Sequence, residues 1–205
     1  PLPAREMRDV TIGVVGLGAM GAGIAQVAVE AGFDVVGREV SDELGARAAS
    51  RIKGFLDRKV AKGLLEPAAR DAAAARLTTT IEVADLAACD LVIEAIVEDA
   101  DAKRVLFADL DRLCRADAVL ATNTSALSVT AIAAATGSPE RVVGMHFFNP
   151  APLMPLLEVV RGELSDERAI AVAVAVGERM GKTVVRCHDT PGFVVNRVLI
   201  PLLND

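Results

Sequence analysis

The chain has few aromatic residues, with no Trp, no Tyr and an aromatic content of 3%, and its formal net charge is −6. Proteins that bind nucleic acid usually present a basic face, and those that bind single strands add aromatic side chains on which the bases stack. Both features are missing here, so we expect no nucleic-acid partner.

Cysteine is also scarce, and the three thiols, Cys89, Cys114 and Cys187, are widely spaced. This spacing matches no metal-ligand motif and suits reduced thiols in a cytoplasmic protein. Long apolar runs are missing as well, since the longest, residues 169–177, is far shorter than the roughly 18 residues of a membrane span. No basic segment followed by an apolar one opens the chain, so nothing indicates export. We therefore expect a cytoplasmic protein with no metal and no membrane partner.

Apolar material is abundant, since 52% of the 205 residues are hydrophobic and 24% are charged. This composition is typical of a globular protein. Short apolar runs bounded by Gly or Pro alternate with stretches of helical periodicity. The runs cover residues 10–15, 33–36, 91–96, 119–125, 142–147, 156–160 and 183–185. The alternation predicts an α/β fold with a doubly wound, mostly parallel sheet, whose ligands bind at the carboxyl ends of the strands.

A glycine-rich segment, residues 16–21 (GLGAMG), follows the first apolar run and opens a helix that ends at Gly32. In such a segment the first glycine makes a tight turn, the second lets the backbone approach a pyrophosphate, and the third lets helix and strand pack closely. Glu39 follows the next strand at about the distance at which a carboxylate holds a ribose diol. The pattern indicates a Rossmann-type domain. Its predicted cofactor ligands are Gly16, Gly18, Ala19, Met20, Gly21 and Glu39.

The carboxylate of Glu39 also bears on the choice of cofactor. It favours NAD over NADP because it would repel a 2′-phosphate. Arg38 lies next to it and could offset part of that repulsion. We expect NAD, with NADP as the less favoured alternative.

Two predicted helices matter for the site. Ser41 is predicted to cap the first, which runs to about Lys62 and buries Ile52, Phe55, Leu56 and Val60. The second runs from about Ala100 to Cys114 and is predicted to pack Val105, Leu106 and Leu113. The first carries five cations: Arg51, Lys53, Arg58, Lys59 and Lys62. Such a run is usually the solvated face of a helix, and the alternative is a landing surface for a phosphorylated ligand.

His146 is one of only two histidines, and Glu158 is a single carboxylate inside the apolar run 156–160. Both residues lie on predicted neighbouring strands. An acid beside an imidazole can hydrogen-bond it and fix its tautomer, which is the arrangement of a general base. A histidine satisfied in the core is the ordinary alternative, but the predicted edge of the sheet also gathers Glu98, Asn123, Ser125 and Asn149. This common position favours a catalytic role for His146.

A dinucleotide beside a histidine–carboxylate pair indicates hydride transfer, with the histidine moving the hydroxyl proton. The absence of Tyr excludes the tyrosine–lysine mechanism of short-chain dehydrogenases. The scattered thiols make a catalytic zinc improbable. The remaining reaction is a histidine-dependent oxidation of a secondary alcohol to a ketone.

Five motifs occur in order: GLGAMGAGIAQ at 16–26, DLVIEA at 90–95, NTS at 123–125, GMHFFNP at 144–150 and PGFVVNR at 191–197. Together they resemble the L-3-hydroxyacyl-CoA dehydrogenases, especially the bacterial 3-hydroxybutyryl-CoA enzymes, over about residues 9 to 204. The glycine motif is shared with many dehydrogenases, including the 6-phosphogluconate type, which uses a catalytic lysine. The histidine motif decides against that type.

The resemblance implies a role for each matched residue. His146 would be the catalytic base, or the acid in the reducing direction, and Glu158 its orienting partner. Ser125 would bind the reacting oxygen, and Asn196 would hold the substrate and help to fix His146. Glu98, Lys103 and Asn149 would lie along the cofactor near its nicotinamide. Lys62, with the other cations of its helix, would meet the phosphates of CoA or of a carrier protein's phosphopantetheine arm.

The family has a second, helical domain that follows the PGFVVNR motif. We expect residues 1–188 to form the NAD-binding domain and residues 189–205 to begin a truncated helical domain. That domain would normally supply the homodimer interface and much of the acyl pocket, so dimerisation is in doubt for this chain. An apolar stripe of Leu199, Ile200, Leu202 and Leu203 would then be exposed. The rival interpretation is a dinucleotide-binding module without turnover of its own.

Overall fold

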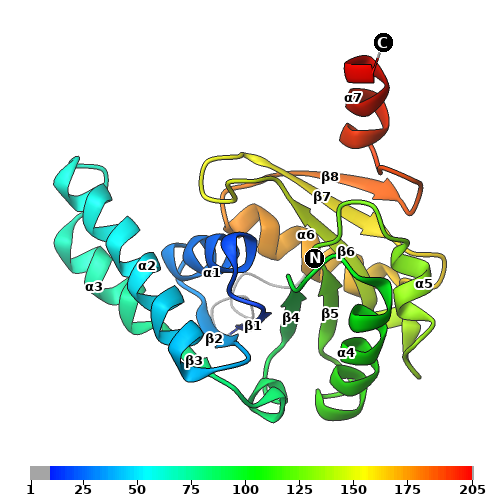
Figure 1. Ribbon diagram of the computed structural model, residues 1–205, viewed down its shortest axis with the longest axis horizontal. Helices are drawn as coiled ribbons and strands as arrows, with labels where there is room; N and C mark the ends of the chain where they lie inside the picture. Colours follow the sequence, from blue (N-terminus) through cyan, green and yellow to red (C-terminus); the bar gives the residue numbers. More distant parts are fainter. Residues whose placement is uncertain (1–9, 205) are drawn as a thin grey trace.

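One sheet organises the molecule. The computed structural model describes residues 10–204, so residues 1–9 and 205 of the two predicted domains lie outside it. Within the described range, eight strands pair in the order β3-β2-β1-β4-β5-β6-β7-β8 (Figure 1). Neighbouring strands are parallel, except that β6 and β7 run antiparallel. The prediction of a doubly wound, mostly parallel sheet is confirmed.

The elements follow one another in the expected alternation. The strands are β1 (Thr11–Val15), β2 (Asp34–Arg38), β3 (Leu77–Thr80), β4 (Leu91–Glu94), β5 (Val119–Thr122), β6 (Val142–Phe147), β7 (Leu156–Arg161) and β8 (Thr183–His188). The α-helices are α1 (Ala19–Glu30), α2 (Asp42–Ala61), α3 (Pro67–Ala75), α4 (Ala100–Leu113), α5 (Val129–Ala133), α6 (Glu167–Arg179) and α7 (Val195–Asn204). Two short 3₁₀ turns, η2 (Val83–Leu86) and η3 (Pro139–Arg141), complete the list.

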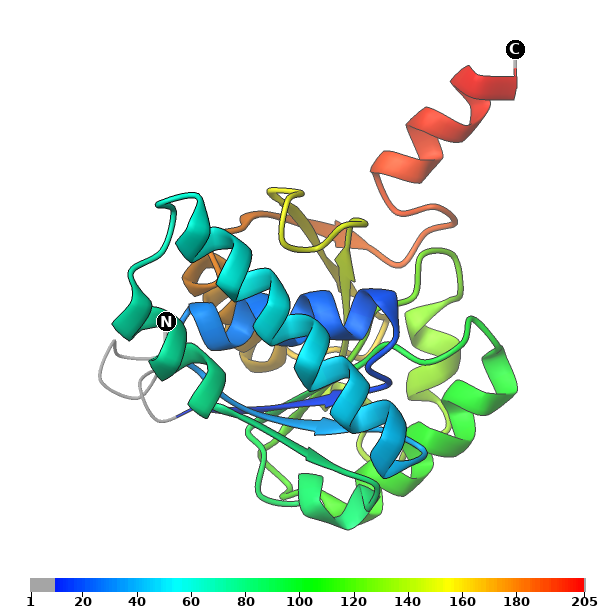
Figure 2. The same cartoon turned by 60° about the vertical axis from the view of Figure 1, so that its left-hand side comes forward.

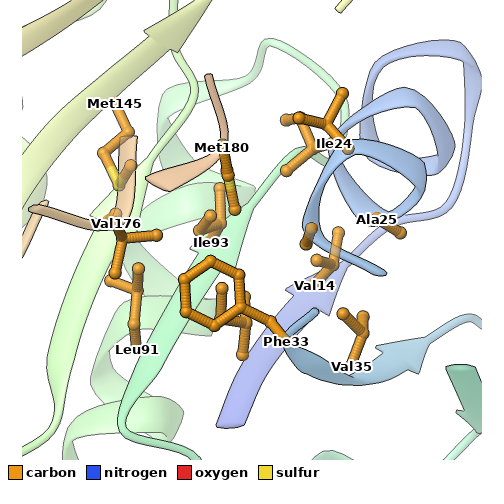
Figure 3. Packing of buried hydrophobic residues seen from close by; sticks show 14 of the residues in the cluster. Val14, Ile24, Ala25, Phe33, Val35, Leu91, Ile93, Met145, Val176 and Met180 are labelled. Carbon is orange, nitrogen blue, oxygen red and sulfur yellow. The ribbon is translucent and has the colours of Figure 1, made fainter. Parts of the chain in front are cut away.

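Helices cover both faces of the sheet, so each face has its own apolar core. Successive strand residues point to opposite faces, and in β4 Leu91 and Ile93 join one core while Val92 joins the other. The first core lies under α1, α2 and α6, where Phe33, Val176 and Met180 pack together (Figure 3). The second core lies under α4, α5 and η2. Burial on both faces explains why the central strands are continuous apolar runs.

The helix predictions were right about extent and partly wrong about orientation. Helix α2 is capped by the Ser41 hydroxyl, which accepts from the Leu44 amide, and it ends at Ala61 with Lys62 as its C-cap, within one residue of the prediction. Phe55, however, is 43% exposed, and the Arg58 guanidinium lies over its ring. On α4 the predicted stripe is wrong at two of three positions, because Val105 and Leu113 are exposed. The buried face of α4 instead contains Lys103, Leu106, Phe107 and Leu110.

Three elements have weak sequence signals and were not predicted. Helix α3 is rich in alanine and buries only Ala73, so it shows no apolar stripe. Strand β3, with the sequence LTTT, is an edge strand with little burial. Helix α5 has only five residues. Short or edge elements bury too little apolar surface to impose a period on the sequence.

Helix α7 projects away from the sheet (Figure 2). Its apolar stripe is exposed as predicted, with Leu202 at 68% and Leu203 at 74%. Pro201 lies inside this helix. Among the described helices, none is both long and apolar enough to cross a membrane.

Candidate functional site

The glycine segment forms a tight loop between β1 and α1. Gly16 has a φ of +84°, a conformation that glycine adopts without strain. A Cβ on Gly21 would lie 1.7 Å from the Gly16 carbonyl oxygen, whereas one on Gly18 would meet nothing within 4 Å. No side chain caps the start of α1 at Gly18. The loop therefore offers free helix N-terminal amides beside open space, which suits a pyrophosphate.

Glu39 lies beside this loop, immediately after β2. Its Oε1 accepts a hydrogen bond from the Leu17 amide at 2.7 Å, and its Oε2 accepts from the Val40 amide at 3.0 Å. These two amides hold the carboxylate in one orientation. Arg38 donates from Nε to the Ile81 carbonyl at 3.1 Å, so its guanidinium is partly engaged within the chain.

His146 and Glu158 are register partners on the antiparallel strands β6 and β7. The His146 Nδ1 and the Glu158 Oε2 are 2.7 Å apart, and the two residues are only 6% and 0% exposed. An ionised carboxylate can only accept a hydrogen bond, so it pairs with an imidazole that carries a proton on Nδ1. The rings of Phe148 and Phe193 pack against the imidazole. The imidazole is therefore held between one carboxylate and two aromatic rings.

The second oxygen of Glu158 binds the segment that opens α7. Oε1 accepts hydrogen bonds from the Val194 amide at 3.0 Å and the Val195 amide at 2.9 Å. Backbone amides have no signature in a sequence, so this contact could not be predicted. One buried carboxylate thus joins the imidazole to the start of α7.

Ser125 lies after β5, close to Glu98 on the loop before α4. Glu98 Oε1 accepts from the Ser125 amide at 2.9 Å and from its hydroxyl at 3.4 Å. Burial alone would raise the pKa of Glu98, but hydrogen bonds from Thr124 and Ser125 and the Lys103 ammonium lower it below its usual value. The side-chain Nδ2 of Asn196 donates to the Ser125 backbone carbonyl at 3.3 Å. The structure thus brings Ser125, Glu98 and Asn196 together.

Asn123 and Asn149 have different surroundings. Asn123 accepts from the Phe147 amide at 2.9 Å, which ties the ends of β5 and β6 together. Asn149 is exposed on the loop after β6, beside the cis bond to Pro150.

Lys103 is buried, although it lies near the start of α4. Its side chain is 1% exposed, and its Nζ lies 2.6 Å from Glu94 Oε1 and 3.2 Å from Glu98 Oε2. Glu94 was not singled out from the sequence. The signal that drew attention to Glu158, a carboxylate within an apolar strand, is equally present in the run LVIE that ends at Glu94.

The basic run on α2 is only partly available to a ligand. Arg51 donates to the carbonyls of Leu17 and Gly18 in the glycine loop, and Lys59 pairs with Glu30. Lys53 and Lys62 are exposed. Lys62 follows the last residue of α2, a helix of 20 residues, and about 30 Å of helix separates it from Ser41 at the other end. Lys62 therefore lies one helix length away from the carboxyl end of β2, where Ser41 and Glu39 are found.

Asp189 joins the end of β8 to the start of α5. Its carboxylate accepts from the Ser128 hydroxyl at 2.7 Å and from the amides of Val129 and Thr130 at 3.1 and 2.8 Å. Burial alone would raise its pKa, but hydrogen bonds from Thr130, Ser128 and Val129 lower it. This carboxylate fixes the loop that leads to Val194.

We expect Asp189→Asn to lower the free energy of unfolding by about 1–2 kcal/mol at neutral pH. Because folding lowers the pKa of this carboxyl, its stabilisation is present above the ordinary pKa of Asp and is lost as the pH falls through the folded value. The difference between the two proteins should shrink at acid pH. Urea unfolding across the acid range measures it, with Asp101→Asn, whose side chain is 89% exposed, as the control. A difference that grows at low pH would contradict the assignment.

The chain is similar in sequence to a family of NAD-binding dehydrogenases. The family model described as "3-hydroxyacyl-CoA dehydrogenase, NAD binding domain" matches residues 11–190. A probable 3-hydroxybutyryl-CoA dehydrogenase of Deinococcus radiodurans is 43% identical over 94% of this chain and 69% of its own length. A 3-hydroxybutyryl-CoA dehydrogenase of Mycobacterium tuberculosis is 46% identical over 94% of this chain and 68% of its own length.

Solved structures agree. The crystal structure of an (S)-3-hydroxybutyryl-CoA dehydrogenase from Ralstonia eutropha superposes with a TM-score of 0.93 at 38% identity, covering 95% of this chain and 69% of that one. The chain spans about two thirds of the length of these relatives.

Proposed function

Because this chain belongs to the 3-hydroxyacyl-CoA dehydrogenase family, whose NAD-binding domain it contains, we propose that it interconverts L-3-hydroxyacyl-CoA and 3-ketoacyl-CoA thioesters. The observation that carries the proposal is the buried His146–Glu158 hydrogen bond, on strands β6 and β7 of the same sheet whose strand β1 leads into the glycine loop. A thioester on a carrier protein is the alternative form of the same substrate.

The glycine loop and Glu39 fit NAD. The open space at Gly18 and the uncapped start of α1 would receive the pyrophosphate. The carboxylate of Glu39, held by two amides, would accept the adenosine ribose hydroxyls. Glu98, Lys103 and Asn149 are proposed to border the nicotinamide half, Lys103 from behind Glu98. NAD, when bound, accepts the hydride from C3 of the alcohol.

The proton of the alcohol is assigned to His146. Its Nε2 would take the proton from the 3-hydroxyl as the C3–H bond breaks, and in the reverse direction it would return the proton. Glu158, already bonded to Nδ1, would stabilise the imidazolium that forms. No water is needed in either direction.

Ser125 and Asn196 are proposed to hold the substrate. With substrate bound, the Ser125 hydroxyl would turn its single proton from Glu98 to the oxygen that becomes the ketone, while its amide stays bonded to Glu98. Asn196, on the first turn of α7, would contact the substrate from the other side. Lys62, with Lys53, is proposed to meet the phosphates of CoA far from the reacting carbon. Because salt screens the attraction between exposed charges, these cations would bind the phosphates weakly and would not distinguish CoA from a carrier protein's phosphopantetheine arm.

The test is NADH oxidation by the purified chain on addition of acetoacetyl-CoA. We expect turnover that is absent without the thioester. Fusing to this chain the part of the Mycobacterium tuberculosis relative that lies beyond their match gives a second protein for the same assay. The proposal is wrong if NADH binds to both proteins and neither oxidises it.

A second candidate is a dinucleotide-binding module that needs another polypeptide for turnover. The exposed stripe of α7, including Leu199, Leu202 and Leu203, favours it, because such a face is ordinarily covered. A second copy of the chain, forming a homodimer, is one proposed cover. If this second candidate is correct, the fused protein oxidises NADH on addition of acetoacetyl-CoA and the chain alone does not.

A further inference from the structure

A buried ion pair lies directly behind Ser125. Glu94 ends β4 and Lys103 belongs to α4, and their side chains are 0% and 1% exposed. Glu94 Oε1 contacts the Lys103 Nζ and also accepts from the Ile96 amide at 2.7 Å. Its Oε2 accepts from the Thr122 hydroxyl at 2.7 Å. Glu94 is therefore fixed by three different segments of the chain.

Lys103 links the buried Glu94 to a carboxylate at the surface. Its Nζ also lies 3.2 Å from Glu98 Oε2, and Glu98 is 41% exposed. The other oxygen of Glu98 accepts from both the amide and the hydroxyl of Ser125. A continuous chain of polar contacts therefore runs from the core at Glu94 to Ser125.

Stability alone does not explain this arrangement. Removing two charges from water is costly, and a well-packed apolar pair of similar volume is often as stable. The arrangement does provide a rigid anchor for an exposed carboxylate, which would otherwise sample several rotamers. A precisely placed serine hydroxyl needs such an anchor.

We propose that Glu94 and Lys103 are positioning residues, which hold Glu98 and, through it, the amide and hydroxyl of Ser125. The catalytic consequence rests on the proposed role of Ser125 as the ligand of the reacting oxygen. The ordering of Ser125 itself does not depend on that role. The low pKa of Glu98 agrees with a carboxylate held ionised by these donors.

Two variants test the proposal. Glu94→Gln removes one charge and leaves the Lys103 ammonium short of a buried partner, so it also lowers stability. Glu94→Gln combined with Lys103→Met removes both charges, so no buried charge is left unpaired and the fold is preserved. In Glu94→Gln the Lys103 ammonium keeps Glu98 but loses its buried tether at Glu94, and in the double variant Glu98 loses the ammonium itself and keeps the Thr124 and Ser125 donors.

The matched control is a second buried ion pair at the other end of α4. Arg141 and Asp111 lie 2.7 Å apart and are 4% and 13% exposed, and Asp111 also accepts from the Gly137 amide. Asp111→Asn breaks a buried pair without touching the chain of contacts to Ser125. It should lower stability and leave Ser125 unaffected.

The first readout is amide hydrogen exchange of Ser125 with NADH present. In both Glu94 variants we expect the Ser125 amide to exchange at least about tenfold faster than in the parent protein, relative to the amide of Ala121 in β5. The second readout is turnover, which should fall about 10- to 100-fold in both variants, while the NADH affinity of Glu94→Gln, which keeps every proposed cofactor residue, changes by less than about threefold. Asp111→Asn should change neither the exchange ratio nor turnover.

The outcomes separate the two proposals. If the double variant regains both the Ser125 protection and turnover, the pair only balances charge and the inference is overturned. If the parent protein shows no turnover, the proposed reaction fails, but the exchange of Ser125 still decides the positioning role. If Glu94→Gln does not fold, the exchange of the Ser125 amide and the turnover of the double variant decide the question.

Discussion

His146→Gln is expected to lower turnover by about 10²–10⁴-fold, the usual contribution of a positioned general base. Glutamine can still hydrogen-bond Glu158, so the fold should remain, but it cannot take a proton. NADH affinity should stay nearly unchanged, because the proposed adenosine site at Glu39 and the glycine loop does not involve this side chain. Steady-state NADH oxidation with acetoacetyl-CoA and fluorescence titration of NADH measure the two effects.

The other histidine of the chain is the matched control. His188 is exposed on the edge strand β8, so His188→Gln should keep the full rate. Equal losses in the two variants would point to a general effect of histidine removal, and full activity of His146→Gln would refute the assignment of the base.

Gly21→Ala is expected to weaken NADH binding by at least about 100-fold, equal to about 2.7 kcal/mol. The added Cβ would lie 1.7 Å from the Gly16 carbonyl oxygen. Both groups belong to the backbone of one tight loop, so neither can rotate away, and the loop must open. The free amides at the start of α1 would then no longer face one ligand.

Gly54→Ala is the matched substitution in another helix. A Cβ there would approach nothing closer than the Arg58 guanidinium at 3.8 Å. NADH affinity should therefore be retained, and stability should rise by about 0.5–1 kcal/mol because alanine favours the helix. Isothermal titration and thermal unfolding of both variants provide the comparison. Retained NADH affinity in Gly21→Ala would show that the loop is not the cofactor site.

Buried strands were the most predictable part of the fold. Val142–Phe147 matches its predicted range, and Leu156–Arg161 differs by one residue. The error on α4 has a simple origin. The predicted stripe consisted of apolar residues alone, Val105, Leu106 and Leu113, whereas the buried face includes Lys103 together with Leu106 and Leu110.

The site was predictable where a side chain departs from its apolar surroundings, as His146 and Glu158 do. It was not predictable where the partner is a backbone group, because every residue has the same amide. The bonds from Val194 and Val195 to Glu158 are of this kind. The role of Asp189 was missed for the same reason, since two of its donors are amides.

The contact between Glu158 and the start of α7 has a mechanical consequence. A hinge before Val194 would pull both amides from the carboxylate that orients His146, whereas a bend after Asn196 leaves them in place. Further along, Pro201 has no N–H to donate, so the helix lacks one of its own bonds there. A bend of α7 at Pro201 would therefore leave the two amides on Glu158 and the imidazole aligned.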